Sequence, residues 1–322
     1  MTERSLRIAT RASELALRQA RLVESALVAR GIACELVTFK TTGDKRLDEP
    51  LSEIGAKGLF THELETALRK KKVDCCVHSL KDLPTELPEG LVIGAILERE
   101  DPRDVLVVNP VTQADGIAAL PAGTRVGTSS LRRRAQLMAA RPDLEVVELR
   151  GNVPTRLRKV ETGQVHAAIL AAAGLIRLDS TARIKQFLDA PEWLPAAGQG
   201  AIAVEIRADD DELRELLSPL NHHETEIAVR AERAFLAGLD GGCQVPIGAL
   251  VMTDDDSDVR TLHGFVSDTR GREIVRGSIE VDRDSPEVSG RALATELRTR
   301  GATSLLMELR ESGHKLISPQ PE

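Results

Sequence analysis

The sequence is poor in aromatic residues, which make up 2% of it and include no tyrosine. Hydrophobic residues nevertheless account for 42%, so the cores must be built mainly from leucine, valine, isoleucine and alanine. The shortage of aromatic rings also removes the stacking platforms on which single-stranded nucleic acids bind. Because the net charge is −7 as well, we expect no nucleic-acid partner.

Cysteines and long apolar runs are also scarce. The 4 cysteines stand at positions 34, 75, 76 and 243, and no two have the C-x-x-C spacing of a zinc site. No stretch approaches the roughly 18 apolar residues that a membrane span requires. Residues 1–11 carry charged side chains in place of the apolar segment of a signal peptide. We therefore expect a cytoplasmic protein with no membrane association, metal site or disulfide framework.

Basic residues are concentrated in one stretch of this acidic chain, and such an island indicates a site for an anionic ligand. The stretch from 125 to 159 holds nine basic residues, Arg125, Arg132, Arg133, Arg134, Arg141, Arg150, Arg156, Arg158 and Lys159, against three acidic ones, Asp143, Glu145 and Glu148. An ordinary solvated basic helix face is the alternative, and charge counting alone does not separate the two.

The length of 322 residues indicates two or three domains. Strand-like and helix-like patterns alternate over residues 6–77 and again over 105–171, which predicts two α/β units with parallel sheets. Residues 200–206 form a strand whose natural place is in the first unit. The chain should therefore cross between the units twice and form a hinge.

After residue 222 the pattern changes to a helix, three strand-like runs and a further helix, which predicts a small α+β domain. The hinge is expected near residues 99–104 and 193–199. The predicted domains are 1–99 with 200–217, then 105–193, and finally 222–322.

Three predicted strand ends carry residues suited to ligand binding, and ligands of α/β proteins gather beyond the carboxyl ends of strands. Residues 127–133 (GTSSLRR) offer hydroxyls, helix N–H groups and guanidinium forks that suit carboxylates. Residues 149–156 (LRGNVPTR) offer a glycine turn between two arginines. In residues 78–84 (HSLKDLP), Asp82 would stay ionised among cations and could stabilise a developing positive charge. Each motif also has a plainer explanation as a helix cap, a charged surface or a turn before proline.

Cys243 lies in a glycine-rich turn, GGCQ at 241–244, at the start of the third domain. A lone cysteine is usually a small buried hydrophobic residue. In an enzyme it can be a nucleophile, but no histidine adjoins it, so a protease-like role is unsupported.

Ten short motifs, in this order, resemble those of the hydroxymethylbilane synthase (porphobilinogen deaminase) family along essentially the whole chain. They are RIATR at 7–11, GLF at 58–60, HSLKD at 78–82, REDPRD at 99–104, GTSSLRR at 127–133, LRGN at 149–152, LP at 194–195, GQG at 198–200, NHHE at 221–224 and GGCQVP at 241–246.

The resemblance implies a fold of two periplasmic-binding-protein-like domains and a third domain that bears a cofactor cysteine. It implies a transferase of tetrapyrrole and haem biosynthesis that is a cytoplasmic monomer. Such an enzyme deaminates four porphobilinogen molecules and joins them head to tail on a covalently bound dipyrromethane. Water then releases linear hydroxymethylbilane.

The same resemblance assigns roles to individual residues. Cys243 would hold the dipyrromethane through a thioether bond, and Asp82 would hydrogen-bond pyrrole N–H groups and stabilise cationic intermediates. Backbone groups at Gly151, Asn152, Gln199 and Gly200 would help to bind acetate and propionate groups. The side chains expected to bind those groups are Arg11, Ser13, Ser79, Lys81, Thr128, Ser129, Ser130, Arg132, Arg133, Arg150, Arg156 and Arg177.

Some positions depart from the family pattern or receive no role from it. Glu53 stands where some relatives carry lysine, although Lys57 keeps a positive charge nearby. Cys75 and Cys76 have no assigned role.

The main alternative is a solute-binding or anion-sensing protein of the same two-domain shape. A secreted receptor should carry a leader sequence, and a transcriptional sensor should carry a helix-turn-helix segment before the first strand; the sequence shows neither pattern. A binding protein also has no use for Cys243 in a third domain. These points favour the enzyme.

Overall fold

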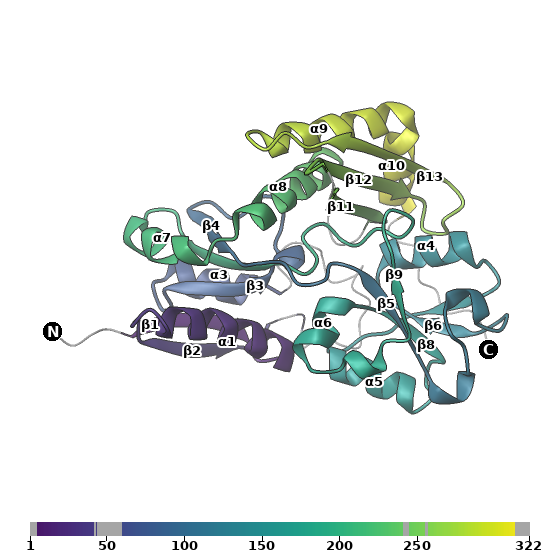
Figure 1. Cartoon of the computed structure of the whole chain (residues 1–322), viewed down its shortest axis with the longest axis horizontal. Coiled ribbons are helices and arrows are strands. Elements are labelled where there is room, and N and C mark those ends of the chain that lie inside the picture. The colour runs from purple at the N-terminus through teal and green to yellow at the C-terminus, as the bar shows by residue number, and fades with distance from the viewer. Residues whose placement is uncertain (1–4, 42, 44–59, 241–244, 255–256, 313–322) are drawn as a thin grey trace.

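The structure is a computed structural model that describes residues 5–41, 43, 60–240, 245–254 and 257–312. These residues form two five-stranded sheets and one three-stranded sheet. Figure 1 shows three groups of elements, with the first sheet on the left, the second on the right and the third above them. The predicted α/β class with a small C-terminal α+β unit is confirmed. No helix in this described part of the chain is long and apolar enough to cross a membrane.

The first sheet has the strand order β2-β1-β3-β10-β4. Its strands are β1 (Leu6–Arg11), β2 (Cys34–Phe39), β3 (Cys75–Ser79), β4 (Leu91–Ile96) and β10 (Ile202–Arg207). Helix α1 (Glu14–Val28) packs Val23 and Leu27 on one face, together with α7 (Asp211–Leu217). Helix α3 (His62–Arg69) packs Leu64 and Leu68 on the other face, as their i, i+4 spacing predicts.

The second sheet has the strand order β7-β6-β8-β5-β9. Its strands are β5 (Asp104–Val108), β6 (Arg125–Gly127), β7 (Glu145–Val147), β8 (Ala167–Ala171) and β9 (Gln186–Leu188). Helix α4 (Leu131–Ala140) buries Leu137 on one face, whereas α5 (Val153–Glu161) and α6 (Ala172–Arg177) bury Leu157 and Leu175 on the other. Short 3-10 helices complete these two units: η1 (Leu80–Asp82), η2 (Pro110–Thr112), η3 (Ile117–Ala119), η4 (Thr181–Arg183) and η5 (Ser218–Leu220).

Both large sheets are mixed, so the prediction of parallel sheets is wrong in one respect. Strand β10 runs antiparallel to β3 and β4, and β5 runs antiparallel to β8 and β9. In each sheet the antiparallel strand is the one that the chain enters after crossing from the other unit. Strand–helix alternation predicts that strands exist, but it does not give the direction of a strand that arrives from elsewhere.

This antiparallel entry places both crossover segments at the edge where the parallel strands of each sheet end. Asp104, the first residue of β5, pairs with Ala171 at the end of β8. Ile202, the first residue of β10, pairs with Ser79 at the end of β3. The chain therefore crosses between the two sheets where their parallel strands end.

The third unit packs two helices on a three-stranded sheet. Its elements are α8 (His223–Gly238), β11 (Ile247–Thr253), β12 (Arg260–Ser267), β13 (Ile274–Glu280) and α9 (Pro286–Leu297), followed by a π-helical turn (Arg298–Ala302) and α10 (Thr303–Ser312). The fully buried Glu232 of α8 accepts hydrogen bonds from the Arg99 guanidinium, from the Gly198 N–H and from the Val251 N–H. One carboxylate thus joins both crossover segments to this unit.

Candidate active site

Strand ends of the first sheet carry five predicted site residues. Arg11 ends β1, and its guanidinium lies 4.4 Å from the ring centre of Phe60. Ser13 caps α1 by accepting a bond from the Ala16 N–H. Ser79 ends β3 and exchanges hydrogen bonds of 2.8 and 3.2 Å with Gln19 of α1. Lys81 and Asp82 follow in η1, beyond the end of β3.

The loop between β6 and α4 carries the three predicted hydroxyl residues, which hold the turn itself. Thr128 Oγ1 accepts from the Ser130 N–H at 3.2 Å, and Ser129 Oγ donates to the Leu149 carbonyl at 2.8 Å. Ser130 caps α4 by accepting from the Arg133 N–H at 3.4 Å. A hydroxyl has one O–H donor, so Thr128 and Ser130, which only accept in these bonds, keep a donor for a carboxylate, whereas Ser129 already donates to Leu149.

The loop between β7 and α5 is a glycine turn followed by a helix cap. Gly151 has a φ of 111°, and a Cβ there would lie 2.8 Å from Thr155 Cγ2, so the position requires glycine. Asn152 caps α5 by accepting from the Thr155 N–H at 3.0 Å. Arg156 Nε donates to the Gly151 carbonyl at 2.8 Å, which holds this guanidinium against the turn.

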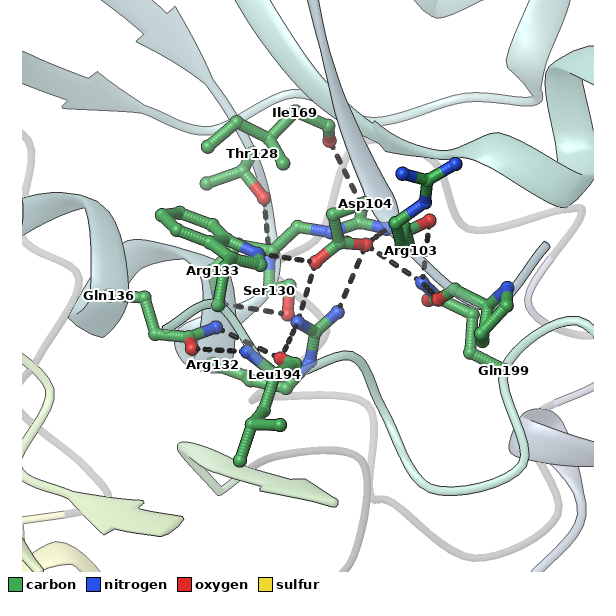
Figure 2. A network of polar contacts seen from close by, with 12 residues as sticks. Arg103, Asp104, Thr128, Ser130, Arg132, Arg133, Gln136, Ile169, Leu194 and Gln199 are labelled. Carbon is green, nitrogen blue, oxygen red and sulfur yellow. Dashed lines mark hydrogen bonds and ion pairs between the residues drawn. The ribbon is translucent and has the colours of Figure 1, made fainter. Parts of the chain in front are cut away.

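Asp104 is the centre of a buried polar network between the two sheets (Figure 2). Its Oδ2 accepts from Arg132 Nη1 at 2.6 Å, and its Oδ1 accepts from Arg133 Nη2 at 2.7 Å. Trp193 Nε1 donates to Oδ2 at 2.9 Å. Although burial alone raises the pKa of Asp104, the two guanidinium groups lower it well below its usual range. Asp104 is therefore a permanent anion.

Gln199 and Gly200 lie where the second crossover segment meets the first. Gln199 Nε2 donates to Asp104 Oδ1 at 2.9 Å, and its Oε1 accepts from Lys81 Nζ at 3.2 Å. Gly200 has a φ of 91°, and a Cβ there would lie 2.2 Å from the Glu100 carbonyl oxygen, so only glycine fits. Its own carbonyl accepts from Arg177 Nη2 at 2.7 Å.

Several cations lie close enough together at this edge to influence one another electrostatically. Burial, and then Arg133 and Arg150, lower the pKa of Arg156 to about 10. Burial, and then Arg133, lower the pKa of Lys81 to about 8. Burial also lowers the pKa of Arg177. Arg150 Nη1 is buried and has no hydrogen-bond partner among the described residues. Such a cluster is stabilised by an anion that brings several oxygens.

Asp82 is the anion of the first unit whose field reaches these cations. Its charge raises the pKa of Lys81 beside it and that of Arg156 on α5, opposing the effect of burial on both. Residues from η1, α4 and α5 thus act on one another electrostatically. The structure brings the motifs at 78–84, 127–133 and 149–156 to one place, which we call the interdomain site.

Cys243, the predicted attachment residue, lies outside the described residues, as do Glu53 and Lys57. Among the described residues, Cys76, His78 and Glu205 form a group close enough to hold a metal ion, with ligand atoms within 4.8 Å of one another. His78 Nε2 lies 3.0 Å from Glu205 Oε2, and both side chains are buried. The interdomain site suits an organic anion, because the buried Arg150 Nη1 requires an oxygen acceptor and the half-buried Arg156 lies beside it.

Sequence reasoning missed Asp104 and Gln19 as members of the site. Asp104 lies within the REDPRD motif at 99–104, and it directly precedes the apolar run VLVV. A charge that opens a fully buried strand must be paired, which is a usable signal. Gln19 sits mid-helix among apolar residues, and only its hydrogen bonds to Ser79 reveal it.

Comparison with protein families covers most of the chain. Residues 6–215 match the model described as porphobilinogen deaminase, dipyromethane cofactor binding domain, and residues 226–299 match the porphobilinogen deaminase C-terminal domain. The chain therefore belongs to the porphobilinogen deaminase family. The resemblance identified from the ten motifs is confirmed.

Curated relatives in this family match along nearly their whole length. Porphobilinogen deaminase of Moorella thermoacetica is 53% identical over 312 residues, which cover 96% of this chain and 98% of the relative. That of Syntrophobacter fumaroxidans is 50% identical over 311 residues, which cover 96% and 99%. Membership makes the protein a transferase with a dipyrromethane cofactor-binding domain.

Solved structures with similar arrangements include substrate-binding proteins. The methionine-binding protein MetQ is 13% identical with a TM-score of 0.44, over 69% of this chain and 92% of that chain. A periplasmic substrate-binding protein of an ABC transporter from Coxiella burnetii is 17% identical with a TM-score of 0.42, over 69% and 94%.

Proposed function

We propose that this member of the porphobilinogen deaminase family acts as a hydroxymethylbilane synthase through the interdomain site. It joins four porphobilinogen molecules head to tail and releases linear hydroxymethylbilane. The observation that carries this proposal is the cluster of half-buried cations at the interdomain site, in a chain that matches the family over nearly its whole length.

The cation cluster supports the binding of pyrrole carboxylates. Each porphobilinogen unit brings an acetate and a propionate group, so a growing chain accumulates negative charge. Guanidinium groups bind carboxylates through two parallel hydrogen bonds. These bonds neutralise the carboxylate and fix the position of the pyrrole ring that carries it. The ligand side chains are those predicted from the sequence: Arg11, Ser13, Ser79, Lys81, Thr128, Ser129, Ser130, Arg132, Arg133, Arg150, Arg156 and Arg177, with backbone groups at Gly151, Asn152, Gln199 and Gly200.

The dipyrromethane is attached to Cys243 through a thioether bond in this proposal. When bound, it supplies the pyrrole carbon to which new units are added. Arg150 and Arg156 would hold its carboxylates, because a buried guanidinium N–H without a partner is costly until an acceptor reaches it.

Asp82 is the proposed catalytic residue. Deamination and condensation pass through positively charged pyrrole species, and the surrounding arginines raise the free energy of such a charge. Asp82 is the anion in the loop beyond β3 whose field reaches Lys81 and Arg156. A preorganised carboxylate at this place lowers the free energy of the developing cation.

The finer features of the proposal follow the family resemblance. The protein works as a cytoplasmic monomer, and its domains are 1–99 with 200–217, 105–193 and 222–322. The first two domains move about residues 99–104 and 193–199 as the product lengthens. Light scattering of the purified protein across a concentration series tests the monomer, because a self-associating chain would gain mass with concentration.

Intact-mass measurement of the purified protein tests the central claim. The mass should exceed that of the polypeptide by two linked pyrroles, and Cys243→Ser should lose this excess together with activity. Cys34→Ser is the matched control, because Cys34 is a partly exposed free cysteine, and it should keep both. A bare polypeptide mass in an active wild-type preparation would overturn the attachment at Cys243.

A further inference from the structure

We propose that Asp104 is a positioning residue that holds Arg132 and Arg133 as one preformed fork and links that fork to both crossover segments. The proposal deepens the function above and rests on it for its kinetic part. Its contacts are those of the resting protein, which are independent of the reaction.

Asp104 acts through other residues, because the protein itself occupies both of its oxygens. The side chain has no exposed surface. Oδ1 accepts from Arg133 Nε and Nη2 at 3.1 and 2.7 Å, and from Gln199 Nε2 at 2.9 Å. Oδ2 accepts from Arg132 Nη1 at 2.6 Å and from Trp193 Nε1 at 2.9 Å. A ligand carboxylate therefore meets the arginines and does not meet Asp104.

Without Asp104 the two arginines would be difficult to hold side by side. Both arginines are buried: Arg132 has 4% and Arg133 has 6% of its surface exposed. Burial lowers the pKa of Arg132, Arg133 lowers it further, and Asp104 opposes both effects. Two like charges in a buried place repel each other unless an anion lies between them. Asp104 supplies that anion from the neighbouring strand.

The fork keeps donors for a ligand after these bonds are made. A guanidinium group has five N–H donors. Arg133 uses Nε and one N–H of Nη2 on Asp104, and one N–H of Nη1 on the Ile169 carbonyl at 3.0 Å. Its remaining N–H groups can donate to a ligand carboxylate, and the bonds to Asp104 fix the orientation of the guanidinium plane.

The same carboxylate connects the two units across the crossovers. Lys81 Nζ donates to Gln199, Gln199 donates to Asp104, and Asp104 accepts from Arg133. This continuous chain runs from the loop that carries Asp82 to helix α4. Trp193, at the other end of the second crossover segment from Gln199, also donates to Asp104. Binding of a carboxylate to the arginine fork can therefore change the hydrogen bonds to both crossover segments. These are the segments about which we expect the domains to move.

The contact with Trp193 supplies a readout that does not depend on turnover. The sequence contains 1 tryptophan and no tyrosine, so the intrinsic fluorescence comes from an indole bonded to Asp104. In Asp104→Asn the anion beside the indole is removed, and we expect the resting emission maximum to shift. Addition of porphobilinogen should change the emission of wild-type protein and change that of the variant much less.

Steady-state kinetics of Asp104→Asn tests the positioning role. We expect KM for porphobilinogen to rise on the order of 10- to 100-fold, since a buried charge pair loses one partner, while kcat falls less. Asp104→Glu keeps the charge on a longer side chain and should recover part of the loss. Asp143→Asn is the matched control, because Asp143 pairs with Arg141 at the exposed surface of the same unit, and it should behave as wild type.

If Asp104→Asn does not fold, its kinetics cannot be measured, so a milder substitution is also needed. Trp193→Phe removes the indole N–H and keeps an aromatic ring and every charge. It should raise KM by up to roughly 10-fold, because the lost N–H donates to a charged carboxylate and such bonds are stronger than neutral ones. Unchanged KM in Trp193→Phe, or wild-type KM and emission in a folded Asp104→Asn, would overturn the proposal. Absence of turnover in every preparation, with the emission shift present, would instead refute the proposed function.

Discussion

Lys81 of η1 is hydrogen-bonded to Gln199 of the second crossover segment, with Lys81 Nζ 3.2 Å from Gln199 Oε1. Burial and the neighbouring Arg133 lower the pKa of this lysine to about 8. A substantial part of Lys81 is therefore neutral in the ligand-free protein at mildly alkaline pH. A bound carboxylate stabilises the ammonium form, so ligand binding must be linked to proton uptake there.

The linkage predicts that affinity for porphobilinogen falls as the pH rises above 8. Between the pKa of about 8 in the free protein and the higher value in the complex, binding takes up a proton, and KM should rise by up to roughly 10-fold per pH unit. Lys81→Arg stays charged, so its KM should change less over the same range. Lys185→Arg, which alters a surface ion pair with Asp115, is the control. Ionisation of the substrate affects all three proteins alike. Identical profiles for wild type and Lys81→Arg would refute the linkage.

Arg156 is predicted to contribute to binding at a cost to stability. Burial, then Arg133 and Arg150, lower its pKa to about 10, so we expect its positive charge to destabilise the ligand-free protein. Arg156→Leu should therefore raise the free energy of unfolding by about 0.5–2 kcal/mol, while activity falls on the order of 100-fold because a bidentate contact is lost.

The control for Arg156 lies on the same helix. Arg158 is exposed on α5, so Arg158→Leu should change neither stability nor activity. Urea unfolding and initial-rate measurements on both variants separate the two effects. A destabilised Arg156→Leu would show that this arginine supports the fold, as we expect of Arg132, whose loss would leave Asp104 poorly compensated.

Much of this fold could be predicted because local signals agree with it. Ser13 before α1, the apolar spacing of Leu64 and Leu68, and the glycine turn at Gly151 each have a local cause that the structure shows. The return of residues 200–206 to the first sheet is also confirmed. Strand direction could not be predicted, because pairing partners are distant in sequence.

The residues of the site could be predicted from the sequence, but the hydrogen bonds and ion pairs between them could not be predicted. Arg132 and Arg133 were expected to face a ligand, but the structure shows that each also pairs with Asp104. Sequence spacing does not reveal that a residue 28 positions earlier lies between them. Antiparallel entry of β5 creates this contact, and that entry depends on tertiary structure alone.

The exposed ion pair between Arg18 and Asp179 offers a way to test domain motion. Arg18 belongs to α1 of the first unit and Asp179 follows α6 of the second, and their side chains meet at 3.0 Å with 47% and 76% exposure. Such an exposed pair contributes little to stability. In Arg18→Cys/Asp179→Cys, a short bis-maleimide should lock the units and permit early condensations while slowing later ones.

Single variants and product analysis complete this experiment. Arg18→Cys and Asp179→Cys alone, treated with the same reagent, control for modification and for the change at Asp179, whose φ is 53°. Mass spectrometry of the locked enzyme should show accumulated enzyme-bound intermediates. Product release at the wild-type rate would show that the units need not move.

Asp82 is the residue whose replacement should affect the chemistry most selectively. The cations around it, Arg156 and Lys81 among them, are suited to carboxylates and oppose any positive charge on a pyrrole ring. One anion must face that charge. Asp82 follows Lys81 in the sequence, and its charge acts on both Lys81 and Arg156. Loss of such a preorganised group costs about 10²–10³ in rate.

Asp82→Asn keeps the size of the side chain and one acceptor oxygen, so folding and the binding of pyrrole carboxylates should survive. Turnover should fall by about 10²–10³, and mass spectrometry should detect trapped enzyme–intermediate complexes. Asp82→Glu keeps the charge and should retain part of the activity. Glu89→Gln alters an exposed acid of the same unit and should not change the rate. Wild-type turnover by Asp82→Asn would make Asp82 a residue that only forms the turn before Pro84, and the anion that faces the substrate would then have to be another acid of the interdomain site.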